Sequence, residues 1–197
     1  MAAEKLTRDV LMGLEQYAKA RTEFRRQVMA HKARRRAHLG EHATFIFEDQ
    51  LTMRYQVQEM LRIGRIFEAA GIEAELSAYN PLIPDGDNWK ATFHLEFDDP
   101  RQRAKRLMRL IGIEDRVWVR AGDDGERVYA IADEDLDRAA RKKTCAVHFL
   151  RFQLDAHFVQ ALKGGASLAM GIDHPHYAEA LEPVPAHLRE SLLADLD

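Results

Sequence analysis

The sequence has little of the features that would assign a chain to a class at once. Its single cysteine, Cys145, rules out an internal disulfide and suits a reducing compartment. No apolar run approaches the roughly 18 residues of a membrane-spanning helix, and residues 1–10 have no signal-peptide core. Hydrophobic residues make up 46% of the 197 positions and only six are proline, which is typical of folded globular chains. We therefore expect a cytoplasmic protein with no membrane segment.

The short motifs of the common enzyme classes are also missing. The sequence has no phosphate-binding glycine loop, no serine elbow and no Cys-x-x-Cys pair. Cys145 begins the apolar run "CAVHFLRFQL", which predicts a central strand and a buried, inert thiol rather than a nucleophile. The sequence therefore predicts no particular reaction.

The spacing of apolar residues predicts several helices. Repeats of three, four and seven residues predict one long amphipathic helix over residues 8–37. A second helix of about twenty residues is predicted from residue 51 and is closed by Gly71. Asp99 as a cap and Pro100 at the first helical position predict the start of another helix.

Strand signals lie between and after these helices. Residues 90–97 alternate between apolar and polar, so Phe93, Leu95 and Phe97 are expected to face the core. The segment "RVWVRAGDDGERVYAIA" predicts a hairpin around Asp124-Gly125. Irregular alternation of helices and strands, with a hairpin included, favours an α+β fold with a mixed or mostly antiparallel sheet of about five to six strands.

We expect one globular domain over residues 1–197, because no linker or repeat divides the chain. Residues 8–37 would form a long basic helix, 43–172 a mixed helix-and-strand core, and 174–197 an acidic tail of two short helices. A further short helix is predicted at 133–141.

Charge is unevenly distributed along the chain. Residues 21–36 carry seven Lys or Arg against one Glu, and residues 178–197 carry five acids against one Arg. These two segments could attract each other within a chain or across a homodimer. A partner-binding basic face is predicted, consisting of Arg25, Lys32, Arg34, Arg35 and Arg36. A solvated surface and a nucleic-acid interface, helped by a second basic stripe at Arg101, Lys105 and Arg109, are the alternatives.

Two sequences imitate metal motifs. His38-x-x-Glu41-His42 has the order of an inverted zinc-protease motif, but Gly40 interrupts the helix that such a site needs. Residues 85–96 resemble a calcium loop in three positions only, so we interpret them as a turn.

A more plausible metal group follows a predicted strand, in "GIDHPHY". Two histidines separated by one residue can reach one ion, with a neighbouring carboxylate and a histidine from another strand. This candidate iron or zinc site consists of His148, Asp173, His174 and His176. The alternative is that His174 caps a short helix and His148 is a hydrogen-bonded core histidine.

A polar, turn-rich stretch at 79–88 is the predicted place for a small-anion pocket, because a loop of this kind needs partners for its backbone groups. The pocket would be lined by Arg54, Gln58, Arg62, Tyr79, Asn80, Asp85, His94 and Glu96. The alternative is a loop held by the same side chains with no cavity.

Several ordered blocks over nearly the whole chain carry a family resemblance. They include "LTMRYQVQEMLRIGRIFE", "AYNPLIPDGDNWKATFHLEFDD", "IGIEDRVW", "YAIADEDLDR", "AVHFLRFQL" and "GIDHPHY". In these blocks the chain resembles the bacterial domain-of-unknown-function family 3501 (DUF 3501). The resemblance implies no established activity, fold or catalytic residues. Relatives are encoded near rubrerythrin-like and iron–sulfur oxidoreductase proteins, which implies a redox or iron-linked setting.

Three functions are therefore carried forward. The first is an accessory or binding protein that serves a redox or iron-linked system through protein-protein contacts. The second is a mononuclear metal-dependent enzyme that uses the histidine group. The third is a nucleic-acid-binding module that uses the basic helices.

Overall fold

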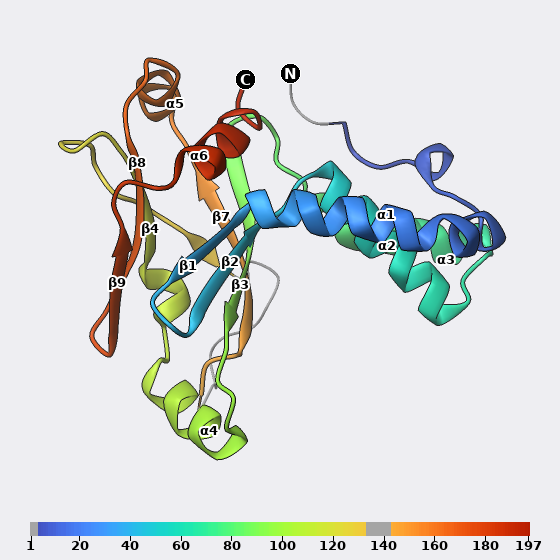
Figure 1. The fold of residues 1–197 in the computed structure, drawn as a ribbon, viewed down its shortest axis with the longest axis horizontal. Coiled ribbons are helices and arrows are strands. Elements are labelled where there is room, and N and C mark those ends of the chain that lie inside the picture. Colours follow the sequence, from blue (N-terminus) through green and yellow to red (C-terminus); the bar gives the residue numbers. More distant parts are fainter. Residues whose placement is uncertain (1–3, 133–142) are drawn as a thin grey trace.

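Two antiparallel sheets and a helical arm make up the part of the chain that the computed structural model describes, residues 4–132 and 143–197 (Figure 1). The helices are α1 (Leu14–Arg34), α2 (Gln50–Gly64), α3 (Ala69–Tyr79), α4 (Pro100–Arg109), α5 (Ala156–Lys163) and α6 (Ala186–Leu193), with 3-10 turns η1 (Arg8–Val10), η2 (Asn80–Leu82) and η3 (Ile113–Arg116). The strands are β1 (Arg36–Leu39), β2 (Ala43–Phe47), β3 (Asn88–Leu95), β4 (Val117–Ala121), β5 (Val128–Tyr129), β6 (Ile131–Ala132), β7 (Val147–Gln153), β8 (Leu168–His174) and β9 (Tyr177–Leu181). The α+β class is confirmed. No helix in the two described ranges is long and apolar enough to cross a membrane.

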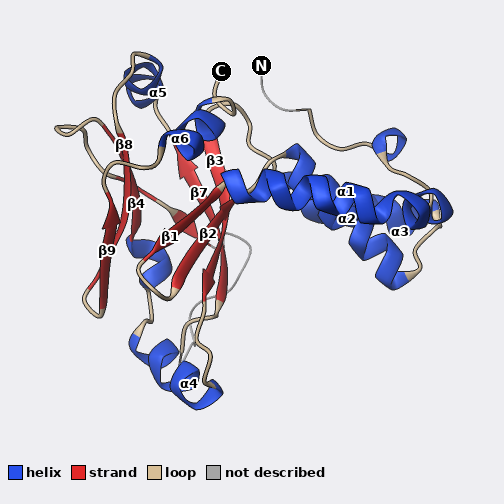
Figure 2. Cartoon of the chain, viewed as in Figure 1, coloured by secondary structure: helices blue, strands red, loops and turns tan. Residues whose placement is uncertain are grey.

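The arm consists of α1, α2 and α3, which project together from the sheets (Figure 2). Apolar residues of α2 and α3 form a cluster separate from the main core together with Leu6 and Ile83, consisting of Leu6, Met53, Val57, Leu61, Ile72, Leu76 and Ile83, and Leu14 of α1 packs against it. Two amide side chains fasten the N-terminal segment to the arm. Gln58 bonds both backbone groups of Met12, and Asn80 bonds both backbone groups of Leu6.

The arm corrects two predicted helix boundaries. The predicted helix over 8–37 begins only after Gly13 and ends at Arg34, because the apolar period changes to two at Ala37 and Leu39, which belong to β1. The predicted helix from residue 51 ends at Gly64. Arg65 there has a left-handed backbone, with φ of 52°, so the chain turns and Gly71 lies inside α3.

The strands divide between two sheets rather than forming one. Sheet A has the order β1-β2-β3-β7-β6 and sheet B the order β5-β4-β8-β9, and all of these neighbouring strands are antiparallel. Their inner faces enclose the main core, in which Phe45 and Phe93 stack with ring centroids 4.5 Å apart and Val119 and Met170 come from sheet B. In Figure 1, α4 lies at the lower end of the sheets, and α5 and α6 at the upper end.

Several local predictions are confirmed. Phe93, Leu95 and Phe97 are buried, and the Asp124-Gly125 segment connects β4 to β5 in a hairpin. Asp99 caps α4 by accepting a hydrogen bond from the Arg101 backbone N–H.

Other local predictions are wrong. Cys145 is exposed, because it lies just before β7, and β7 alternates between buried and exposed side chains instead of being apolar on both faces. The acidic tail contains one helix, α6, and strand β9 in place of its first predicted helix, because His174–Tyr177 form a hairpin turn. The predicted helix at 133–141 lies outside the described residues.

Candidate anion-binding site

The predicted metal group is divided between the two sheets. His148 is completely buried on the inner face of sheet A. Its Nε2 atom lies 2.9 Å from Thr144 Oγ1 and 3.1 Å from the carbonyl oxygen of Cys145. The Thr144 hydroxyl in turn donates to Glu114 over 3.0 Å. His148 therefore belongs to a buried hydrogen-bonded cluster, as the alternative interpretation expected.

The remaining members lie at the end of β8 in sheet B. His174 is buried, its Nε2–H donates to the Ile111 carbonyl over 3.2 Å, and its Nδ1 accepts the backbone N–H of His176 over 3.2 Å. Both ring nitrogens are therefore used. Asp173 is adjacent in the strand and so points to the opposite face of the sheet. Within residues 4–132 and 143–197, no three His, Cys, Asp or Glu side chains are placed to hold a metal ion.

The side chains predicted to line an anion pocket lie in three separate places. Gln58, Asn80 and Asp85 fasten the N-terminal segment, Asp85 through an ion pair with Lys5. Tyr79 packs against the apolar cluster of the arm. These contacts agree with the alternative interpretation, in which internal hydrogen bonds hold the loop.

Arg54 and Arg62 both project from α2 within the arm. Arg62 forms an ion pair with Glu59 over 3.3 Å, and the Arg54 guanidinium lies 5.7 Å from the centroid of the Phe24 ring. His94 lies on the outer face of sheet A instead, and Glu96, which follows β3, accepts a hydrogen bond from the Thr44 hydroxyl. Burial lowers the pKa of His94.

One of the five residues of the predicted basic face is buried. Arg25, Lys32, Arg34 and Arg36 are exposed or half-buried, but Arg35 is only 2% exposed. Its guanidinium donates to the Phe47 carbonyl, to Ser191 and to the carboxylate of Asp195. The prediction that Arg35 lies on a surface is therefore wrong, because the end of α1 turns inward there and meets the acidic tail inside the chain.

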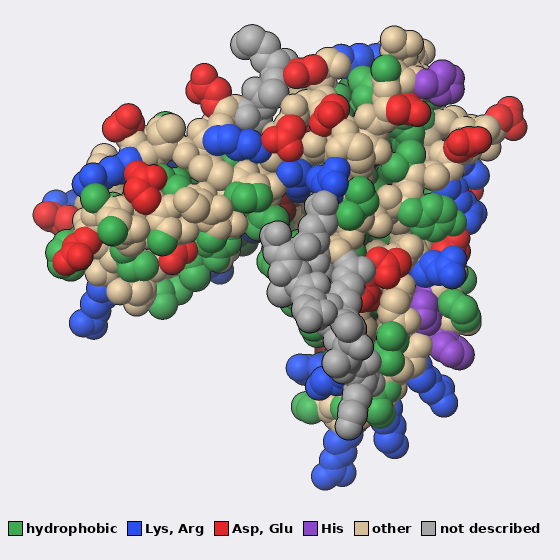
Figure 3. All heavy atoms as spheres, turned by 180° about the vertical axis from the view of Figure 1, so that it is seen from behind, with side chains coloured by type: hydrophobic (Ala, Val, Ile, Leu, Met, Phe, Trp, Pro, Cys, Tyr) green, Lys and Arg blue, Asp and Glu red, His purple; other side chains and the backbone are tan. Residues whose placement is uncertain are grey.

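Helix α4 carries a concentration of positive charge. Its cationic residues are Arg101, Arg103, Lys105, Arg106 and Arg109. None of them has an ion-pair partner within the described parts of the chain. In Figure 3 the Lys and Arg side chains gather at the lower end of the molecule, where α4 lies. Only Leu107 of this helix is buried, so most of its surface is open to ligands.

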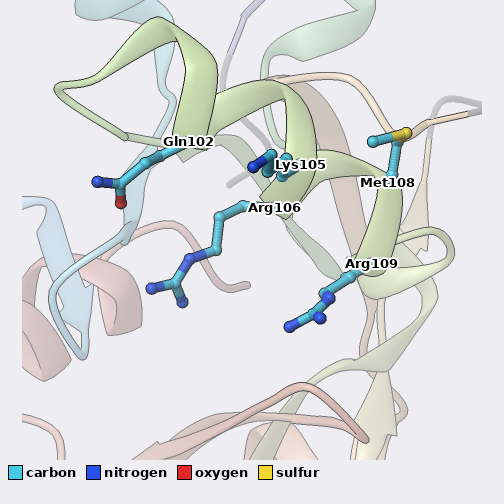
Figure 4. A pocket seen from close by; sticks show the side chains of 5 residues that line it. All are labelled: Gln102, Lys105, Arg106, Met108 and Arg109. Carbon is cyan, nitrogen blue, oxygen red and sulfur yellow. The ribbon is translucent and has the colours of Figure 1, made fainter.

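Two of these arginines line a cleft. Arg106 and Arg109 are three residues apart and therefore share one side of the helix, and Figure 4 shows both guanidinium groups extending from that side. They line a cavity of about 110 Å³ together with Phe97, Leu110, His176 and Tyr177. Arg106 also borders a wider, open basin of about 550 Å³, lined further by Gly40, Glu41, His42, Pro175, His176, Tyr177, Ala178 and Glu179.

Two hairpin turns form the wall opposite α4. The β1–β2 turn passes through Gly40 at φ of 66°, and a Cβ there would lie 2.7 Å from the hydroxyl oxygen of Tyr177. That hydroxyl donates to the Leu39 carbonyl and accepts the backbone N–H of His42. Burial raises the pKa of Tyr177, so the phenol keeps its proton at neutral pH. The two turns are thus fastened to each other.

His42 is held at the same wall. Its Nδ1 atom lies 3.0 Å from the Glu96 carbonyl, so Nδ1 carries a proton, and its ring centroid is 4.6 Å from that of Phe97. The motif from His38 to His42 is therefore a hairpin turn and not a zinc-protease helix. The inner cavity combines two cationic side chains with His176, which is a composition suited to an anion, whereas the open basin also has the carboxylates of Glu41 and Glu179.

Part of this site was visible in the sequence and part was not. The stripe containing Arg109 and the histidines of "GIDHPHY" were noted, but for nucleic acid and for metal. Arg106 and Tyr177 were missed, and His42 was noted only in the zinc-protease-like motif, because nothing local brings residues 42, 106 and 177 together.

Comparisons with known proteins agree with the resemblance found in the sequence. A family model described as "Protein of unknown function (DUF3501)" matches residues 5–196. A crystal structure of a novel protein of unknown function from Burkholderia pseudomallei is similar to this chain, with 51% sequence identity and a TM-score of 0.92. The match covers 98% of this chain and 100% of that one. A search of curated proteins gives no significant match. The chain belongs to the DUF3501 family of proteins of unknown function.

Proposed function

We propose that this protein is an accessory binding protein that holds an anionic group, a phosphate or a carboxylate, in the cleft between α4 and the two hairpin turns. The observation that carries the proposal is the placement of Arg106 and Arg109. Both guanidinium groups line the same cavity, beside His176, and neither has an ion-pair partner in the described parts of the chain.

Guanidinium chemistry supports this ligand class. A planar guanidinium matches a carboxylate or phosphate through two parallel hydrogen bonds, and such charge-assisted bonds are about twice as strong as neutral ones. The inner cavity, at about 110 Å³, is well below the roughly 300 Å³ of a pocket for a drug-sized ligand. It therefore suits one small group, with the rest of the ligand or partner lying in the open basin.

The setting of this binding is also a proposal. An accessory role in a redox or iron-linked system rests on the family resemblance, and an acidic partner would present its anionic group to α4. The metal-enzyme alternative has no supporting cluster among the described residues. A nucleic-acid partner would contact the whole of α4, and the experiment below distinguishes it from a small anion.

The test compares two double variants that remove the same charge from the same helix. Arg106→Ala with Arg109→Ala removes the cationic wall of the cleft. Arg101→Ala with Arg103→Ala is the matched control, because these arginines line none of the cavities described above. We expect phosphate, sulfate or a dicarboxylate to raise the melting temperature of the wild type and of the control. Calorimetry should show binding weakened at least about tenfold in the cleft variant.

Equal weakening in both double variants would show a diffuse charge effect and would refute a built site. Salt-dependent retention of oligonucleotides that both variants lose would assign α4 to nucleic acid. No anion response in the wild type would end the proposal.

A further inference from the structure

A second unusual group of side chains lies on the outer face of sheet B. Trp118 is only 2% exposed, yet it belongs to neither apolar cluster of the chain. It sits on β4 directly opposite Gly171 of β8, and a Cβ at Gly171 would lie 2.4 Å from the indole ring. The indole therefore occupies the space that a side chain at position 171 would need.

The indole is covered by a cation from the same chain. The guanidinium carbon of Arg127 lies 4.1 Å from the centroid of the Trp118 ring, which is a close cation–π contact. Arg127 also donates to Asp173 Oδ2 over 3.1 Å. Tyr129 is the direct cross-strand neighbour of Trp118, and its hydroxyl donates to the same carboxylate oxygen. The guanidinium therefore lies over an indole and bonds a carboxylate that also accepts a hydrogen bond from a phenol.

Arg127 uses only part of the hydrogen-bonding capacity of the Asp173 carboxylate. The other carboxylate oxygen of Asp173, Oδ1, is buried and has no hydrogen-bond partner within residues 4–132 and 143–197. Arg127 reaches Asp173 with a single nitrogen, whereas a carboxylate can accept two parallel bonds from one guanidinium. The side chain of Arg127 is also 41% exposed. A half-exposed ion pair and one stacking contact are each weak in water, so this occupant can be exchanged.

We propose that Trp118, Tyr129 and Asp173 form a binding site for a guanidinium group, which the chain's own Arg127 fills in the absence of a ligand. An untethered guanidinium can stack on the indole and use both oxygens of Asp173 at once. The ligand is either a free arginine-like molecule or an arginine side chain presented by another protein. Arg127 lies between Gly122 and β5, on an exposed loop, so it leaves the site without disturbing a strand.

The test uses Arg127→Gln, which removes the internal cation and keeps a similar side-chain length. Arg120→Gln is the matched control, because Arg120 also lies near the Trp118 ring, at 5.7 Å, but does not contact Asp173. Tryptophan fluorescence is the readout. The second tryptophan, Trp89, is completely buried and donates to the Leu192 carbonyl, so it serves as a constant background.

N-methylguanidinium chloride is titrated at millimolar concentrations against sodium chloride of equal ionic strength. We expect a saturable change in Arg127→Gln with affinity at least about tenfold above that of the wild type and of Arg120→Gln. Adding Asp173→Asn to Arg127→Gln should abolish it. A short peptide with one arginine that binds more tightly than N-methylguanidinium indicates a protein source, and equal affinity indicates a small molecule.

Two outcomes would overturn the proposal. One is the absence of a saturable response in a folded Arg127→Gln protein. The other is an equal gain in Arg120→Gln, which would mean that lower positive charge alone attracts the cation. If circular dichroism shows that Arg127→Gln is unfolded, Arg127→Lys replaces it, since lysine keeps the charge but has no planar guanidinium to stack on the indole.

Discussion

Replacement of Arg35 by alanine is expected to be one of the most destabilising single changes at any charged position of the described chain. The Arg35 side chain is 2% exposed and donates to the Phe47 carbonyl at the end of β2, to Ser191 in α6 and to Asp195 beyond that helix. Burial already raises the pKa of Asp195, which shows that this carboxylate is costly to keep charged without its partner.

The magnitude follows from the partners that the change would leave behind. Removing one member of a buried ion pair costs about 3–5 kcal/mol, because the other charge stays buried without compensation. In a chain of 197 residues this corresponds to a fall in melting temperature of about 10 °C. Urea unfolding followed by circular dichroism measures the free energy directly.

Arg34→Ala is the matched control, because Arg34 is the preceding residue and is exposed. It should change the unfolding free energy by no more than about 0.5 kcal/mol. Asp195→Asn added to Arg35→Ala should recover part of the loss, since it removes the orphaned charge. A cost for Arg35→Ala below about 1 kcal/mol, or an Asp195→Asn effect that simply adds to it, would refute the reasoning.

Two further predictions concern acid stability and the wall of the cleft. Hydrogen bonding from Arg21 is the largest cause that lowers the pKa of Glu59 from 4.5 to about 2. The stability that Glu59 contributes should be present above pH 4.5 and should fall by up to about 3 kcal/mol as the pH falls toward 2. In urea unfolding, the free energy of unfolding of Glu59→Gln should therefore depend less on pH over this range. Gly40→Ala should lower the unfolding free energy by about 1–2 kcal/mol. It should also weaken anion binding in calorimetry, because its Cβ would displace the Tyr177 hydroxyl. Unchanged affinity would show that the turn does not contribute to the site.

Signals confined to a few neighbouring residues were sufficient for much of the fold. The alternation over 90–97, the turn at Asp124-Gly125 and the Asp99 cap each depend on short-range backbone geometry, so the sequence predicted them correctly. Element ends were less certain. Apolar spacing alone could not show that the chain leaves the helix at Arg65.

The sequence by itself determined that this chain folds as α+β, begins with a basic helix and belongs to its family. Only the tertiary structure decided which side chains meet. His148 and His174 lie in different sheets, so the predicted metal group is divided, whereas Arg106 and His176 line one cavity although 70 residues separate them. Strand order and sheet packing fix such meetings, and they depend on long-range burial that leaves no local pattern in the sequence.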